Sequence, residues 1–298
     1  MRITEYLSDS TFKRQIQRNR SQMVKYNDQI ASGKRVTKAS DDSVSYLSAK
    51  LIDEHIRKNE QYQVNANNGL FQARNTQDAL DHMQDLLTSF KTLTIQAANE
   101  SLNAEDRELI ASQVASLKEE FVELANSKFN DVYLFAGTNS DQKPFFEDGV
   151  AAGGIGTSST GTPLKVLAGE GVAVETTVTG LDLRDGPEGD LFEIFQSTID
   201  AMNANDTAAI QTSIDKVGGS IAHIAGLSTD IANQINRLDF AVERLEDRII
   251  GQSGEVSRLT DADIVESMLN FQNAQTAYDA VLGIHSTMMQ TSLLNYLR

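Results

Sequence analysis

Residues 264–298 read IVESMLNFQNAQTAYDAVLGIHSTMMQTSLLNYLR, a repeat that ends the chain and from which its architecture can be argued. Steps of four and three from Ile264 reach mostly apolar residues: Met268, Phe271, Gln275, Tyr278, Leu282, His285, Met289, Ser292 and Tyr296. This spacing is typical of a heptad seam, in which a narrow apolar face of one helix packs against a partner helix. Only Glu266, Asp279 and Arg298 are charged, so we expect even the back of this helix to be covered.

The N-terminal segment carries a second seam with the same spacing: Phe12, Ile16, Asn19, Met23, Tyr26 and Ile30. Each seam is too narrow to be stable alone, so we expect the two ends to pair with each other and with other subunits. Asn19 is the one polar member, and it either fixes the register of the pairing or faces solvent. Two ordinary helices of one globular core are the alternative, but the scarcity of charge near the C-terminus favours assembly.

The two seams together predict an assembly interface. Its expected residues are Phe12, Ile16, Met23, Tyr26, Ile30, Met268, Phe271, Tyr278, Leu282, Met289, Leu293 and Leu294.

Composition excludes several classes of protein. The 298 residues include no Cys, which excludes disulfides, thiol catalysis and thiolate metal sites. No run of about 18 apolar residues predicts a membrane span, and the first residues lack the apolar core of a cleaved signal peptide. Residues 1–40 carry nine Lys/Arg and three Asp/Glu, a net charge of +6. Because the whole chain has a net charge of −16, residues 41–298 have a net charge of −22. The acidic bulk argues against nucleic acid as a partner, while the basic arm either contacts acidic surfaces of neighbouring subunits or forms a solvated face.

Helix breakers are concentrated in the middle of the chain. All three prolines lie between residues 140 and 190, and eleven of the 19 glycines lie between Gly137 and Gly189. The sequence therefore predicts a mainly α fold of long antiparallel coiled-coil-like helices from both chain ends, with a small β-rich inserted domain. We expect residues 41–139 and 188–259 to form a rod of long helices, and residues 140–187 to form the exposed insert.

Helical periodicity runs from Val44 to Asn99, a helix of roughly 85 Å if continuous, and resumes after a cap at Asn103. The most regular ladder starts at Ile210 and ends at Ile249, and Gly218, Gly219 and Gly226 within it mark a break or a close approach. Between Leu259 and Ile264 the repeat slips in phase, beside the capping residues of 260–263.

Within the insert, residues 164–166 and 172–178 alternate as strands do. The run from Gly153 to Ser159 is typical of a flexible loop, and it lacks the ending of a phosphate-binding loop.

The sequence shows no enzyme signature. His55, His82, His223 and His285 are scattered and lack the spacing of metal ligands. The acidic pairs at 41–42 and 261/263 fall where helix N-caps are expected, so capping is preferred over acid–base chemistry or Ca²⁺ binding. We expect no cofactor and no metal.

Three motifs resemble the bacterial flagellin superfamily and, within it, the hook–filament junction proteins. Ser32-Gly33-Lys34-Arg35-Val36 with Ser40-Asp41-Asp42 resembles the family's early signature. The stretch from Tyr133 to Thr138 with Pro144-Phe145, and the ending from Ser292 to Leu297, resemble those of junction proteins. Ala39 and Ser43 stand where the family commonly has proline, and residues 147–187 match nothing in it.

The resemblance implies a structural adaptor between hook and filament, with a filament-forming flagellin as the alternative and an unrelated coiled-coil scaffold as a third. Residues 1–40 and 260–298 would form the inner assembly layer. Other hook-associated proteins, flagellin, further copies in a ring, and an export chaperone at the C-terminal helix would be the partners. The protein would be extracellular and exported without a cleaved signal peptide.

Overall fold

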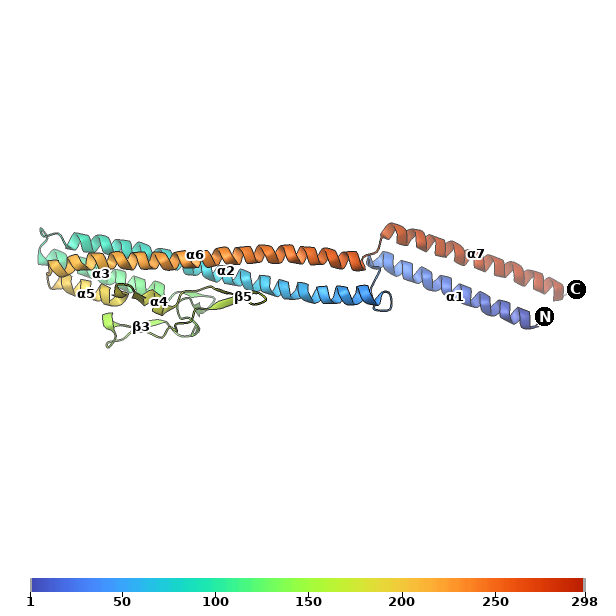
Figure 1. The fold of residues 1–298 in the computed structure, drawn as a ribbon, viewed down its shortest axis with the longest axis horizontal. Coiled ribbons are helices and arrows are strands. Elements are labelled where there is room, and N and C mark those ends of the chain that lie inside the picture. The colour runs from blue at the N-terminus through green and yellow to red at the C-terminus, as the bar shows by residue number, and fades with distance from the viewer. Residues whose placement is uncertain (1, 297–298) are drawn as a thin grey trace. The chain divides into compact units, whose positions relative to one another are not determined.

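The computed structural model describes the backbone of residues 2–296 and the side chains of residues 10–287 except that of Ala152. Its residues form two compact units, one made of 1–58 with 248–298 and the other of 59–247. Most of the described chain is helical (Figure 1). The helices are α1 (Arg2–Ser32), α2 (Ser43–Ala97), α3 (Ala104–Ala125), α4 (Gly180–Arg184), α5 (Leu191–Asn203), α6 (Thr207–Thr260) and α7 (Ile264–Tyr296).

The strands are short and form antiparallel pairs only, within the described residues. They are β1 (Lys128–Phe129) with β2 (Val132–Tyr133), β3 (Phe145–Glu147) with β4 (Ile155–Thr157), β5 (Lys165–Gly169) with β6 (Val172–Glu175), and β7 (Asp185–Gly186) with β8 (Gly189–Asp190). A 3₁₀ turn, η1 (Ala152–Gly154), precedes β4. The expected mainly α fold with small β elements is confirmed.

In the unit 59–247, α2 and α6 run antiparallel. The amide of Gln63 donates to Glu246 at 2.9 Å, and Ser228 donates to Asp81 at 2.9 Å, so residue numbers rise along one helix as they fall along the other. The ladder predicted for α6 is confirmed, because all of its members in this unit are buried or half-buried. A sustained seam of this kind needs a partner of matching length, and α2 supplies it.

Aromatic side chains fill the core between α2, α3 and α5. The rings of Phe90 and Phe195 stack with centroids 4.2 Å apart, and Phe121 lies 5.9 Å from Phe195. All three are fully buried. Their large area and close packing make this cluster the chief apolar anchor of the unit.

Arg107 of α3 is the buried charge of this unit, at 3% exposed. Its guanidinium donates to the carbonyls of Ala97 at 2.9 Å and Asn99 at 2.8 Å, and to the side chain of Asn205. The last carbonyls of a helix lack helical partners, so Arg107 satisfies that of Ala97, adds a second donor to that of Asn99 and ties this end of α2 to the turn before α6.

The Gly-rich run was expected to be a flexible loop, and this expectation is wrong. Residues 155–157 form β4, which pairs with β3. Gly153 adopts φ +69°, and a Cβ placed there would overlap the backbone of Phe192. The missing side chain therefore lets this turn pack against the start of α5. The glycine that suggested a flexible loop in the sequence is needed here for close packing.

The β5–β6 hairpin packs directly on α2. A Cβ at Gly69 would lie 3.1 Å from the Cγ2 of Thr176, and the hydroxyl of Thr176 donates to the Gln72 side chain at 2.8 Å. Val174 and Val178 belong to the buried apolar core. Residues 140–187, expected as an exposed insert, thus contribute side chains to the core of the helical unit.

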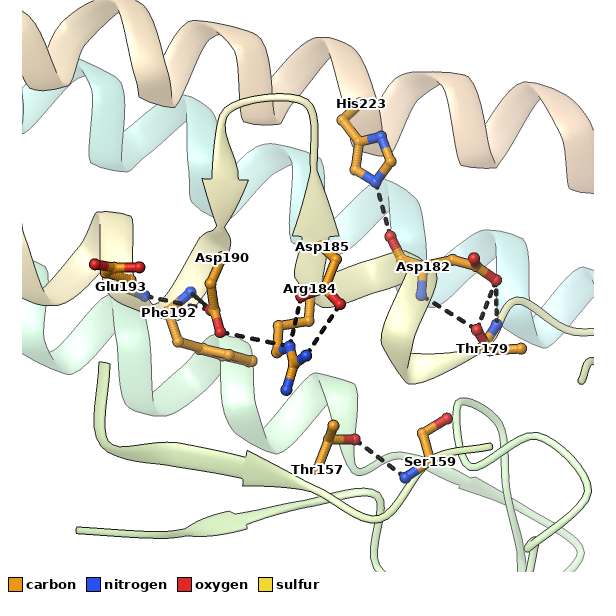
Figure 2. A network of polar contacts seen from close by, with 10 residues as sticks. All are labelled: Thr157, Ser159, Thr179, Asp182, Arg184, Asp185, Asp190, Phe192, Glu193 and His223. Atoms are coloured by element: carbon orange, nitrogen blue, oxygen red, sulfur yellow. Dashed lines mark hydrogen bonds and ion pairs between the residues drawn. The ribbon is translucent and has the colours of Figure 1, made fainter. Parts of the chain in front are cut away.

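A polar network holds the end of this segment to α5 and α6 (Figure 2). Asp190 caps α5 by accepting from the backbone N–H of Phe192 at 2.8 Å, and Arg184 pairs with it at 3.4 Å. Burial raises the pKa of Asp190 above its ordinary value, against the lowering effect of its hydrogen bonds. His223 of α6 lies 2.7 Å from the carbonyl oxygen of Asp182. These bonds are structural, since each closes a helix end or links two elements.

The glycines of α6 produce no break. The helix is continuous from Thr207 to Thr260, and a Cβ at Gly219 would overlap the Glu188 side chain, whereas one at Gly226 would meet open space. Gly219 therefore marks a close approach, the second of the two alternatives.

Candidate assembly interface

Helices α1 and α7 lie side by side in the unit formed by residues 1–58 and 248–298 (Figure 1). The Phe12 ring stacks on the His285 ring with centroids 3.6 Å apart. All six members of the predicted α1 seam are buried or half-buried. The residues of 13–22 that do not belong to the seam are exposed. The α1 seam therefore packs on α7, as expected for pairing of the two chain ends.

On α7 the less exposed positions agree with the predicted seam at Phe271, Tyr278 and His285 but differ from it at the others. They are Ser267, Asn270, Phe271, Ala274, Tyr278, Val281 and His285. Among the predicted α7 residues, Phe271 and Tyr278 face α1, but Met268 and Leu282 are 51% and 40% exposed. Met289, Leu293 and Leu294 lie outside the residues whose side chains the structure describes.

Small side chains explain why the buried positions of α7 are shifted around the helix from the predicted seam. Ser267 and Ala274 are 5% and 7% exposed, and short side chains allow two helices to approach more closely than Met268 and Gln275 would. Other apolar side chains of α7 are left exposed by the described residues. These side chains, which are 40–69% exposed, are Ile264, Val265, Met268, Leu269, Leu282 and Ile284.

Asn19 is buried in the α1–α7 seam at 6% exposed, and its amide nitrogen has no hydrogen-bond partner among the described residues. Phe12 lies beside His285, and the two helices are antiparallel. Asn19, seven residues after Phe12, is therefore opposite Tyr278, seven residues before His285. A buried amide without a partner costs free energy, so this position weakens the pair it belongs to.

Asn19→Leu is expected to stabilise the α1–α7 pair by about 1 kcal/mol, because it removes an unpaired buried amide and adds apolar contact. Amide hydrogen exchange across residues 12–30 of the full chain would measure the gain. Asn27→Leu, at an exposed position of the same helix, is the matched control and should leave protection unchanged. Weaker protection in Asn19→Leu would show that the amide has a stabilising partner.

Beyond α1 and α7, two loops form what we call the clasp, residues 33–36 with 259–262. The backbone N–H of Ala262 donates to the carbonyl of Gly33 at 2.9 Å. The backbone N–H groups of Arg35 and Val36 donate to the carbonyl of Thr260 at 2.7 and 3.1 Å. The clasp thus satisfies a carbonyl at the C-terminal end of α6, which has no partner within the helix.

Side chains reinforce the clasp. The Lys34 ammonium pairs with Asp261 at 2.8 Å, and the Arg35 guanidinium donates to the carbonyl of Leu259 at 2.9 Å. Arg35 also reaches Asp42 at 3.5 Å. Cations beside the last carbonyls of a helix are favoured by its dipole, so the residues of the early signature act on the end of α6.

Three carboxylates in and beside the clasp have lowered pKa values. The hydrogen bond from Lys34 is the main cause of the lowered pKa of Asp261. Ser45, which donates through its hydroxyl at 2.7 Å, is the main cause for the pKa of Asp42. The backbone N–H of Thr37 is the main cause for the pKa of Asp41. The predicted capping is confirmed at Asp42 for α2, and at Asp263 for α7, which accepts from Val265 N–H at 2.9 Å.

The clasp is expected to weaken in acid. A carboxyl group whose pKa is lowered on folding stabilises the folded state above its ordinary pKa, and this stabilisation is lost as the pH falls through the folded pKa. Exchange protection of the Arg35 and Val36 amides, corrected for intrinsic rates, should therefore fall as the pH drops below about 4. In Asp261→Asn the drop should be smaller, because one titrating partner is gone. Constant protection down to pH 3 in the unmodified chain would contradict the role of these carboxylates.

Sequence reasoning missed the pairing of Lys34 with Asp261 and the burial of Ser267. Ser267 lies seven residues before Ala274, and this heptad spacing of two small residues was the available signal. Within the described residues, no cluster of three or more acidic or His side chains is arranged to hold a metal ion. The described helices also include none with the length and apolarity needed to cross a membrane.

Comparison with known proteins agrees with this arrangement. The bacterial flagellin N-terminal helical region matches residues 3–140, which include α1, the clasp's first loop, α2 and α3. Residues 3–140 therefore resemble the flagellin superfamily. Within it, the chain is similar along 98% of its length to flagellar hook-associated protein 3 of Escherichia coli, which is 24% identical and covered to 98%.

Two further comparisons bear on function. Flagellin FlaB1 of Treponema pallidum is 27% identical over 306 residues that cover all of both chains. A solved structure of a putative flagellar hook-associated protein from Vibrio parahaemolyticus shares the fold, with a TM-score of 0.68 and 19% identity. It covers 74% of this chain and all of that one.

Proposed function

We propose that this chain is a structural adaptor of the bacterial flagellum that joins the hook to the filament by helical packing of subunits. The observation that carries the proposal is the α1–α7 pair, which buries one apolar face of α7 and leaves other apolar side chains of that helix exposed. A terminal helix that stays apolar on its outer side suits an assembly in which neighbours cover it. The whole-length similarity to flagellar hook-associated protein 3 supports the hook end of the flagellum as the location of that assembly.

A filament-forming flagellin is the second candidate, favoured by the whole-length similarity to FlaB1. We prefer the junction role because the Tyr133–Thr138 stretch and the C-terminal ending resemble those of junction proteins. In the structure, Leu134, Phe135 and Ala136 of that stretch are buried in the unit 59–247.

The finer features of the proposal concern partners and location. The chain self-associates into a ring, contacts other hook-associated proteins and flagellin, and presents its C-terminal helix to an export chaperone. It reaches the cell exterior through the flagellar export channel without a cleaved signal peptide. Exposed apolar side chains along α7 support a chaperone contact, because such a surface needs cover before assembly.

Deletion of the gene tests the proposal. Cells lacking the chain should carry hooks without filaments and release flagellin into the medium, and a plasmid copy should restore filaments. Electron microscopy and immunoblotting of the medium would measure both. Normal filaments on the deletion strain would overturn the junction role.

A further inference from the structure

The unit formed by residues 1–58 and 248–298 exposes a second apolar surface, on the first turns of α2. Val44, Leu47 and Leu51 are 74%, 61% and 60% exposed. Their spacing of three and four places them on one helix face, and we call them the α2 stripe. The opposite face of these turns includes Ala49, which is 4% exposed, so the stripe points away from the chain's own packing.

At the start of α7, Ile264, Val265, Met268 and Leu269 are 47–69% exposed and form the α7 patch. The stripe and the patch belong to the same compact unit, and each is exposed, so they do not cover one another within one chain. No other described segment covers either surface. Whatever covers them comes from outside the chain.

The two surfaces match in length and charge. Seven residues separate the ends of the stripe and five those of the patch, which correspond to about 10 Å and about 7.5 Å along a helix. Lys50 lies beside the stripe with its side chain 54% exposed, and its pairing with Asp53 is long, at 3.9 Å. Glu266 lies within the patch and is the single charged residue of α7 between Ile264 and Tyr278. An apolar contact flanked by Lys50 and Glu266 would be complementary in both respects.

We propose that the α2 stripe of one copy receives the α7 patch of a second copy. This inference rests on the proposed function and names the surfaces by which its subunits meet. Because the two surfaces differ, the contact is head-to-tail, and each copy keeps a free stripe and a free patch for the next neighbours. Such a contact continues from subunit to subunit, as a ring requires, whereas a contact of identical surfaces ends at a dimer.

The absence of cysteine makes a cross-linking test clean. Leu47→Cys combined with Met268→Cys would be expressed in the deletion strain, and isolated flagella would be oxidised and run on non-reducing gels. The double variant should give dimers and a ladder of larger products, while either single variant should give none. Leu47→Cys with Ile250→Cys is the matched control, since Ile250 is 69% exposed in the same unit and should yield no ladder.

Three results would overturn the inference. They are cross-linking of a single variant to itself, a disulfide within one chain, and products that contain another flagellar protein. Immunolabelling of the same preparation separates the two levels of the proposal. A labelled hook end without a ladder rejects the stripe–patch contact alone, whereas label elsewhere rejects the junction role.

Charge reversal gives an independent reading. Lys50→Glu and Glu266→Lys should each reduce incorporation at the hook end by up to about fivefold, the range expected for an exposed ion pair. The double reversal should restore it, because the pair is re-formed with opposite sense. Equal losses in the single and double variants would contradict the contact.

Discussion

Leu282→Asp is expected to abolish filament attachment while leaving the unit 59–247 folded. Leu282 is 40% exposed in the free subunit and is not among the less exposed positions of α7, so the substitution is tolerated there. In an assembly that covers the face of α7 that carries Leu282, an unpaired buried carboxylate costs several kcal/mol, and about 3 kcal/mol weakens association more than 100-fold. Cells carrying the variant should show bare hooks and release flagellin into the medium.

Leu282→Met is the matched control, because it keeps an apolar side chain of similar volume and should support normal filaments. Secretion of Leu282→Asp must be measured separately, since an export chaperone that binds this helix would also be affected. Normal filaments on secreted Leu282→Asp would contradict the role of this face. Loss of cooperative unfolding in the purified variant would instead favour the alternative in which α7 belongs to one globular core.

Arg107→Met should destabilise the unit 59–247 by about 3 kcal/mol. The substitution leaves the carbonyl of Ala97 and the side chain of Asn205 without the donor that satisfies them, and the carbonyl of Asn99 with the N–H of Leu102 alone. Removing one member of a buried charged network has this magnitude because the remaining groups stay desolvated. Urea unfolding followed by circular dichroism would measure the change.

Arg74→Met provides the control for Arg107→Met. Arg74 is 53% exposed and pairs with Asp239 at 3.4 Å, so its loss should cost at most about 1 kcal/mol. Similar midpoints for the two variants would show that burial of Arg107 contributes little.

Periodicity and capping predicted most of the helical architecture. The ladder of α6, the start of α3 at Asn103 and the α1 seam follow from local rules, because helical spacing and N-cap chemistry act within a few residues. The long helix expected from Val44 to Asn99 is α2, which begins and ends within two residues of those limits.

What sequence reasoning could not predict depends on contacts between distant residues. Which face of α7 packs on α1 depends on the close packing of Ser267 and Ala274. The sequence has two neighbouring apolar faces on this helix, and periodicity alone does not distinguish them. Gly153 lies in a run whose composition is that of a flexible loop. Its φ of +69° and its closeness to Phe192 depend on tertiary structure. The clasp joins Lys34 to Asp261 across 227 positions of sequence, beyond the reach of any local pattern.

The position of the chain along the flagellum is the most direct test of the junction role. An epitope inserted at Val150, which is 94% exposed between β3 and η1, should be accessible to antibody and remote from α1 and α7 in sequence. Immunogold labelling of intact flagella is predicted to give one cluster at the boundary between hook and filament. Gold distributed along the filament would contradict the junction role and identify the chain as a filament flagellin.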